Sequence, residues 1–275
     1  AGPGVTLSFL LAALGCSFSG LCYAELSTLA PSAGSSYSFS YFAVGECTAC
    51  VVGLVNIAGN VLAAAAVARG WEGYTRLFLL KLGVQPPEVF GGFHLGPFQA
   101  SPVAALLIVV IVAINFLGTK ATSAFNNVVT FASVTLLCCF IAGAAPYVEP
   151  ANWQPMLPHG THGVVEAAGT VFFAYLGFDV LATLGEEAEH PNVVPRGIVL
   201  TLLLSGILYC ATGLVFTGLV SYPEIEVTAP LARAADLRGL HRLAVAVSAG
   251  AVGNTLTTVI GGVLGGPRIC YVMAQ

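Results

Sequence analysis

Charged residues are scarce in this sequence, and their scarcity decides which solvent the chain can fold in. Only 8% of the 275 residues are Asp, Glu, Lys or Arg, whereas 57% are hydrophobic. Ordinary globular domains carry about 25% charged residues. The chain therefore lacks the polar surface of a soluble domain, and its composition predicts a protein that lies in a membrane.

A basic excess is also missing. The sequence has nine Lys and Arg against 13 Asp and Glu, for a net charge of −4, and no long basic run. Proteins that bind nucleic acids need clustered positive charge to meet the phosphates. We therefore expect no nucleic-acid partner.

Patterns typical of disulfide scaffolds, metal sites and catalytic centres are absent as well. The cysteines lie in or beside the apolar runs rather than in the longest connections, which argues against a disulfide scaffold. His159 and His162 have a spacing that metals can use, but no third ligand is evident. No apolar run carries a histidine in its middle, and no nucleophile–base pair stands out. We expect no metal, no cofactor and no enzymatic activity.

What the chain does have is apolar runs long enough to cross a bilayer core of about 30 Å. Such runs must form helices, because lipid offers no partner to open backbone groups, and they do not alternate as barrel strands do. The sequence predicts an all-α membrane protein with residues 1–275 as a single transmembrane domain. Its seven transmembrane helices are expected at roughly 3–23, 38–68, 102–118, 125–145, 164–184, 198–220 and 243–265.

The chain begins at Ala1 without an initiator methionine and stops at Gln275, at the end of the segment "GGPRICYVMAQ". Neither end has a polar segment leading into or out of the membrane. We expect the sequence to be part of a longer membrane protein.

Two acidic residues fall inside predicted membrane helices, Glu46 and Asp179. An ionisable group at a helix centre costs at least about 2.5–3.5 kcal/mol on insertion, so it is a functional candidate by default. Structural alternatives remain open. Glu46 could be an interfacial residue near a helix end or a carboxylate paired with a helix neighbour, and Asp179 could cap amides freed beside Gly177.

Gly177 weakens the predicted helix 164–184 near its middle. A helix broken at that depth is tolerated only where its open backbone is buried in protein or lines a watery cavity. Transporters use such breaks to present backbone groups to a substrate. The sequence therefore predicts a broken helix around Gly177.

Several stretches resemble the cationic amino acid transporters of the amino acid–polyamine–organocation superfamily. "SFLLAALGCSFSGLCYAELSTLAPSAGSSYSFSYFAVGE" is similar to their second and third helices, and "NFLGTKATSAFNNVVTFASV" to their fifth. "GTVFFAYLGFDVLATLGEEAEHPNVVPRGIV" resembles their sixth helix with its loop, and "GGPRICYVMA" the end of their eighth. The resemblance implies an inverted five-plus-five helix repeat with a broken sixth helix. The seven helices then correspond to the second to the eighth, so the first helix and those after the eighth are missing.

The resemblance also implies a substrate site. Main-chain carbonyls around Phe173 and Leu176, opened by Gly177, would receive the substrate ammonium, which needs three acceptors. The remaining substrate-binding positions that it implies are Phe178, Asp179, Glu46 and Thr257.

Three further positions have other expected roles. Glu186 and Glu187 match a gating motif, with a solvated acidic loop as the alternative. Ser133 stands where proton-coupled relatives carry a lysine, and a serine cannot titrate as an ammonium does. The hydroxyls of Thr257 and its neighbour Thr258 could ligate sodium, or they could bond back to the preceding helical turn.

The predicted function is transport of cationic amino acids such as arginine, lysine and ornithine by alternating access. The partners would be a small amino acid and the lipid bilayer. Transport of neutral amino acids or polyamines stays open, as does the less favoured reading of a seven-helix receptor-like binding protein. The plasma membrane is the expected location, with vacuolar or lysosomal membranes as alternatives.

Lys and Arg are unevenly distributed between the predicted connections. The positive-inside rule would place the longer connections in the cytoplasm, because they hold more of these residues. The resemblance implies the opposite orientation, and we follow it. The longer connections carry Arg69, Arg76, Lys81, Arg233, Arg238 and Arg242, and the shorter side carries Lys120, Arg196 and Arg268.

Overall fold

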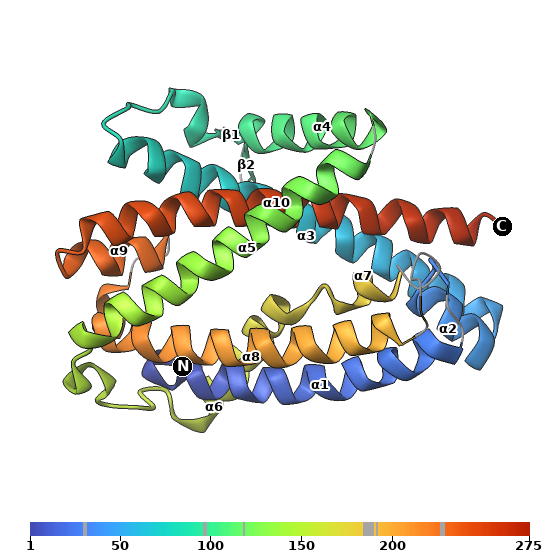
Figure 1. Ribbon diagram of the computed structural model, residues 1–275, viewed down its shortest axis with the longest axis horizontal. Coiled ribbons are helices and arrows are strands. Elements are labelled where there is room, and N and C mark those ends of the chain that lie inside the picture. The colour runs from blue at the N-terminus through green and yellow to red at the C-terminus, as the bar shows by residue number, and fades with distance from the viewer. Residues whose placement is uncertain (30–31, 96–97, 118, 184–189, 191, 226–228) are drawn as a thin grey trace. The chain divides into compact units, whose positions relative to one another are not determined.

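The computed structural model describes residues 1–29, 32–95, 98–117, 119–183, 190, 192–225 and 229–275, and most of them are helical (Figure 1). The chain divides into two compact units. The first unit comprises residues 1–59, 148–222 and 265–275, and the second comprises residues 60–147 and 223–264.

The first unit is built around two long helices, with shorter helical pieces packed beside them. The long helices are α1 (Val5–Leu29) and α8 (Val193–Leu219), and the other α-helices are α2 (Ser36–Ala43), α6 (Gly160–Val171) and α7 (Phe178–Ala182). Short 3-10 turns connect them at Gly2–Gly4, Pro150–Trp153, Phe172–Tyr175 (η5) and Tyr222–Glu224. The amino-terminal part of α3 (Glu46–Lys81) and the last turns of α10 (His241–Met273) complete this unit.

The second unit contains the rest of α3 and α10. Its other helices are α4 (Pro102–Leu117), α5 (Thr119–Ala144) and α9 (Pro230–Leu237), with 3-10 turns at Glu88–Gly91 and Ala145–Tyr147. A small antiparallel pair, β1 (Phe93–Leu95) and β2 (Phe98–Ala100), precedes α4.

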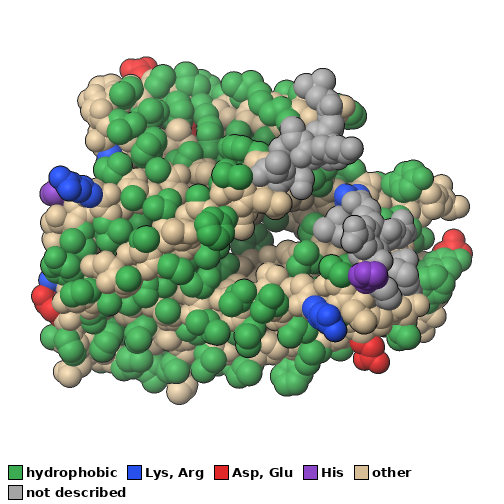
Figure 2. Space-filling model, in the orientation of Figure 1, with side chains coloured by type: hydrophobic (Ala, Val, Ile, Leu, Met, Phe, Trp, Pro, Cys, Tyr) green, Lys and Arg blue, Asp and Glu red, His purple; other side chains and the backbone are tan. Residues whose placement is uncertain are grey.

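The predicted all-α membrane fold is confirmed, and the protein is a multi-pass membrane protein. Within the described ranges, six helical segments are long and apolar enough to cross a membrane. Their most apolar stretches are only 11–33% buried, so most of their apolar surface is available to lipid or further protein. Figure 2 shows hydrophobic side chains over most of the visible face, with scattered charged ones. The six segments are Gly2–Leu29, Glu46–Lys81, Phe125–Tyr147, Gly160–Ala182, Val193–Leu219 and His241–Met273.

The seventh expected helix, α4, is shorter than the others. It has 16 residues, and at about 1.5 Å per residue it falls short of a bilayer core of about 30 Å.

The expected helix 38–68 is wrong in its boundaries, because this run forms two helices. Between α2 and α3 the backbone of Gly45 has φ +113°, a conformation that glycine adopts readily and that ends a helix. Glu46 then begins α3, where a carboxylate is favoured by the helix dipole. At its other end α3 continues to Lys81, so Arg69, Arg76 and Lys81, which were expected in a longer connection, lie in this helix.

Helix α1 lies along α8 (Figure 1), and its buried positions toward the unit's core are mostly small residues. Gly20 lies so close to Ile198 and Leu202 that a β-carbon at this position would contact both side chains. Further along, Gly206 of α8 faces Ala13 of α1 at 3.6 Å from its ideal Cβ position. Small residues let membrane helices approach closely and gain dispersion contacts. The buried α1 positions are Ser8, Ala12, Cys16, Gly20, Ala24 and Ser27.

We expect Gly20→Leu to destabilise the protein by about 1–3 kcal/mol, because overpacking a close helix interface forces side chains and backbone to shift. Thermal unfolding of the detergent-solubilised full-length protein would measure the loss. Leu202→Ala should restore part of it by making room in the same contact. If Gly20→Leu unfolds at the wild-type temperature, the α1–α8 packing described above is incorrect.

The core of the second unit joins α3, α4 and α10. Ala68, Leu107 and Val259 are among its buried residues. Beside it, Ser101 caps α4 by accepting the Ala104 N–H at 3.1 Å, and its hydroxyl donates to the Glu72 carboxylate. Glu72 is only 6% exposed. The dipole of α4 and the Ser101 hydroxyl both favour a carboxylate here, while the other Glu72 oxygen, Oε1, accepts no bond from the described residues.

Candidate functional site

The helix that begins at Gly160 is interrupted in the first unit, as the sequence predicts. It passes from α6 into the 3-10 turn η5, and the backbone at Leu176 is then extended, with ψ 147°. Gly177 follows with φ +125°, and α7 starts at Phe178 (Figure 1). The broken helix is therefore confirmed.

The conformation of Gly177 explains why a glycine stands here. No atom lies within 4 Å of the position that its β-carbon would occupy, so the surroundings are open. The constraint is the positive φ itself, which side chains rarely adopt. Gly177 thus permits the break through its backbone freedom.

The break leaves two main-chain carbonyls open. The Leu176 N–H donates to the Phe173 carbonyl at 3.3 Å, and the Gly177 carbonyl accepts from Val180 and Leu181 at 3.2 and 3.3 Å. Among the described residues, no hydrogen bond reaches the carbonyls of Tyr175 and Leu176. The sequence predicted acceptors around Phe173 and Leu176. The Phe173 carbonyl is bonded, whereas the carbonyls of Leu176 and of Tyr175, a residue only 4% exposed, accept no bond from the described residues.

Three hydroxyl groups hold the broken segment in place. The Tyr175 hydroxyl donates to the Phe9 carbonyl of α1 at 3.0 Å, and the Tyr209 hydroxyl donates to the Ala174 carbonyl at 3.1 Å. Ser35 donates to the Asp179 carbonyl at 3.0 Å. The bonds to the Ala174 and Asp179 carbonyls satisfy backbone groups beside the break, and the Tyr175 bond ties the segment to α1. The open carbonyls therefore belong to a fixed segment.

Aromatic packing adds to this support. The rings of Tyr175 and Tyr209 meet edge to face at 5.2 Å, and Tyr209 also lies 5.7 Å from Phe9. Phe178 is 6% exposed and contacts Tyr23 edge to face at 5.4 Å. Phe178 therefore anchors α7 to α1, and a direct substrate contact by its side chain stays a prediction.

The side chains of Phe173 and Leu176 have the opposite environment. They are 49% and 51% exposed. Phe173 lies two residues before Tyr175, and Leu176 itself carries one of the unbonded carbonyls. Both side chains can therefore contact the apolar part of a ligand that the carbonyls hold.

Asp179 supports the break directly. Its Oδ1 accepts the Gly177 N–H at 3.0 Å, and its side chain is partly exposed. The capping alternative raised for this residue is thus observed. The charge of the carboxylate remains beside the break, and its action on a substrate stays a prediction.

Glu46 lies elsewhere in the first unit and is exposed. As the first residue of α3 it occupies a helix end, which is the structural alternative raised for this residue, and its action on a substrate stays a prediction. It lines a pocket of about 950 Å³ formed by the ends of α1, α3 and α10 together with α2. The other lining residues are Leu26, Leu29, Ser32, Tyr37, Ser38, Phe39, Tyr41, Phe42, Ala43, Val272, Met273 and Gln275.

The remaining predicted residues fall in the second unit or outside the described residues. The Thr257 and Thr258 hydroxyls both donate to the Asn254 carbonyl, at 2.9 and 2.8 Å, so they bond back within α10. Ser133 donates to the Gly250 carbonyl at 3.4 Å and links α5 to α10. Glu186 and Glu187 lie outside the described residues.

Sequence reasoning missed the groups that support the break. Ser35 and Tyr209 are far from the break along the chain, and nothing in their local sequence marks them. Ser35 is buried with φ 48°, a conformation unusual for serine that the surrounding structure must maintain. The main chain of Tyr175 could have been found, because it lies just before the glycine that opens the helix.

Comparison with known proteins identifies relatives over the whole chain. A family model described as amino acid permease matches residues 1–275. The branched-chain amino acid permease BcaP of Bacillus subtilis (strain 168) is 36% identical over 281 residues, covering 100% of this chain and 60% of that protein. The methylthioribose transporter of the same organism is 35% identical, with the same two coverages.

A plant relative gives a similar match. The chloroplastic cationic amino acid transporter 9 of Arabidopsis thaliana is 35% identical over 270 residues, covering 95% of this chain and 48% of that protein. The chain thus spans about half to three fifths of the length of these relatives.

Proposed function

This chain belongs to the amino acid permease family, and on that premise we propose that the full-length protein carries amino acids across a membrane by alternating access. The observation that supports this most is the fixed helix break, with the open carbonyls of Tyr175 and Leu176. Breaks of this kind present backbone groups to ionic substrates in transporters.

The chemistry of an amino acid fits these carbonyls. A substrate ammonium carries three N–H donors and must replace the water that it leaves behind. An intact helix has no acceptors to spare, because each carbonyl already bonds the N–H four residues on. The break provides two acceptors, and elements of the full-length protein outside this chain would supply the third and hold the substrate carboxylate.

The first candidate substrate class is the cationic amino acids. Asp179 keeps a carboxylate beside the break, and a negative charge there attracts a lysine, arginine or ornithine side chain. Resemblance to cationic amino acid transporters, including the Arabidopsis relative, agrees with this choice.

The second candidate class is neutral amino acids with branched apolar side chains. Phe173 and Leu176 are about half exposed and offer apolar contacts next to the open carbonyls. The Bacillus relative is named a branched-chain amino acid permease. In this alternative Asp179 acts only as the cap that holds Gly177.

The other candidate residues have secondary roles in this proposal. Ser133 supplies no titratable ammonium, so uptake would follow the membrane potential without proton coupling. Thr257 would contact substrate only if its hydroxyl left the Asn254 carbonyl. Glu186 and Glu187 would form part of a gate, and the plasma membrane is the proposed location.

Uptake by the full-length protein in liposomes tests the proposal. We expect saturable uptake of radiolabelled arginine, driven by an inside-negative potential and unchanged by a proton gradient at fixed potential. Preferential uptake of leucine would favour the second class. If a panel of cationic and neutral amino acids gives no uptake above that of empty liposomes, the proposed function is wrong.

A further inference from the structure

Positive charge gathers at one corner of the second unit, where the end of α3 meets α9 and the start of α10. Lys81, Arg233, Arg238 and Arg242 belong to this corner, which is four of the nine Lys and Arg in a chain of net charge −4. Bringing like charges together is unfavourable unless anions offset them. Asp236 is the one acidic residue in the sequence between positions 233 and 242.

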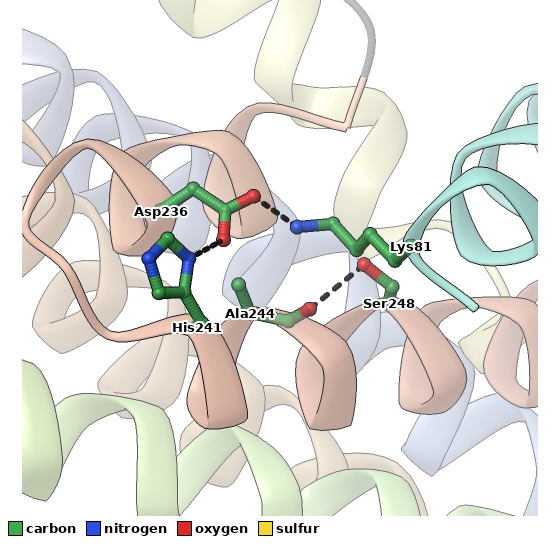
Figure 3. A network of polar contacts seen from close by, with 5 residues as sticks. All are labelled: Lys81, Asp236, His241, Ala244 and Ser248. Carbon is green, nitrogen blue, oxygen red and sulfur yellow. Dashed lines mark hydrogen bonds and ion pairs between the residues drawn. The ribbon is translucent and has the colours of Figure 1, made fainter. Parts of the chain in front are cut away.

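Asp236 organises the corner (Figure 3). Its Oδ2 pairs with the Lys81 ammonium, and its Oδ1 lies 3.1 Å from His241 Nδ1. The Lys81 and Asp236 side chains are only 16% and 22% exposed. Burial alone would raise the pKa of Asp236, but the hydrogen bonds from Lys81 and His241 outweigh it and hold this pKa below its usual value. The carboxylate is therefore ionised at neutral pH and fixes both partners.

The backbone around Asp236 is fixed as well. Gly239 has φ +74° and ends α9, with its N–H bonded to the Asp236 carbonyl at 2.9 Å. The Leu240 N–H bonds to the Ala235 carbonyl at 2.9 Å, which completes a Schellman motif. This closed turn sets the position of Asp236 against His241 in the first turn of α10. The arrangement is therefore preorganised.

A pocket of about 470 Å³ opens at this corner. Lys81 and Arg233 line it as donors, beside His241 and Leu237, with Asp236 as its one described carboxylate. Because both Asp236 oxygens already accept bonds from Lys81 and His241, the pocket presents mainly donor groups to a ligand. A donor-rich pocket of this size suits an oxyanion such as a phosphate group.

We propose that this pocket binds the phosphate group of an anionic phospholipid. The apolar part of α10 begins at Leu243, two residues after His241, which places the pocket at the level of lipid headgroups. Leu237 lines the pocket and is 51% exposed, so apolar surface continues beside the donors. Basic pockets between membrane helices bind anionic headgroups on the cytoplasmic side, so this proposal takes the orientation that the Lys and Arg distribution favours and not the one that the resemblance implies. A choline headgroup adds a cation that these donors repel.

Native mass spectrometry of the detergent-solubilised full-length protein tests this proposal. Titration with phosphatidylglycerol and phosphatidylcholine should show about tenfold tighter binding of phosphatidylglycerol. Arg233→Gln should weaken phosphatidylglycerol binding about tenfold, since it removes a charge-assisted donor from the pocket. Arg233 is exposed, and an unchanged unfolding temperature of the variant would show that its fold is intact.

Arg196→Gln is the matched control, because Arg196 is an exposed arginine of α8 outside the pocket. It should bind phosphatidylglycerol as the wild type does. Equal affinity for both lipids, or equal losses in Arg233→Gln and Arg196→Gln, would overturn the proposal. Displacement of phosphatidylglycerol by an equal concentration of inorganic phosphate would assign the pocket to free phosphate instead of lipid.

Discussion

Gly177→Val in the full-length protein is expected to lower amino acid uptake by roughly ten- to a hundredfold. Valine adopts the φ of +125° found at this position only with strain, which costs about 1–3 kcal/mol. The backbone would relax by turning the Leu176 carbonyl away from its present direction, and each 1.4 kcal/mol of lost binding is about tenfold. Initial uptake of radiolabelled arginine and leucine, compared at equal amounts of reconstituted protein, measures the effect.

Gly169→Ala is the control for that experiment. Gly169 lies in α6 with open space around its β-carbon position and an ordinary helical backbone. Alanine there should leave uptake close to wild type, because it fits the helix without strain. If Gly177→Val transports as well as Gly169→Ala, the break does not contribute to the substrate site.

Asp179→Asn is expected to lower arginine uptake at least tenfold more than leucine uptake. At an effective dielectric near 20, losing a charge roughly 6–8 Å from a substrate cation removes about 2–3 kcal/mol of attraction. Asparagine keeps the oxygen that accepts the Gly177 N–H, so the cap is preserved. The ratio of the two initial uptake rates, mutant against wild type, isolates the electrostatic effect.

Glu46→Gln provides the matched comparison for Asp179→Asn. It also removes one carboxylate, but Glu46 is exposed at the start of α3 and lines a pocket whose described lining residues do not include the break. Solvent screens an exposed charge, so we expect little change in the arginine-to-leucine ratio. Equal falls for both substrates in Asp179→Asn would leave Asp179 with a structural role alone and favour the branched-chain alternative.

The break could be predicted from sequence because its cause is local. Gly177 interrupts an otherwise apolar helix, and the positive φ that it adopts depends on the residue itself. Gly45 has the same property, yet the apolar run 38–68 continues on both sides of it and conceals the turn. Hydropathy measures transfer to lipid and does not report backbone direction, so Glu46 was expected within a helix that it in fact begins.

The long-range contacts could not be predicted in the same way. The far end of α3 extends to Lys81 in a region with several charges. Glu72 meets Ser101 there, and Lys81 meets Asp236, 155 residues away. A count of Lys and Arg along the loops treats each as an independent charge, whereas Lys81 is already paired. Arg69, Arg76 and Lys81, which the sequence assigned to a longer connection, lie within α3.

The polar groups that hold the break could not be predicted from the local sequence either. Ser35 lies 144 residues from Asp179, and Tyr209 lies 35 residues from Ala174. Serine and tyrosine hydroxyls are common in membrane helices and usually bond within their own turn or at interfaces. Only the packing of α1, α7 and α8 shows which of these hydroxyls support the broken segment.

A structure of the full-length protein with bound arginine or leucine tests the central claim most directly. The account predicts a substrate ammonium within about 3.2 Å of the Tyr175 or Leu176 carbonyl oxygen, the normal range for such hydrogen bonds. The Gly177 backbone should keep its positive φ. A substrate bound away from residues 173–179, or a continuous helix through Leu176 and Gly177, would contradict it.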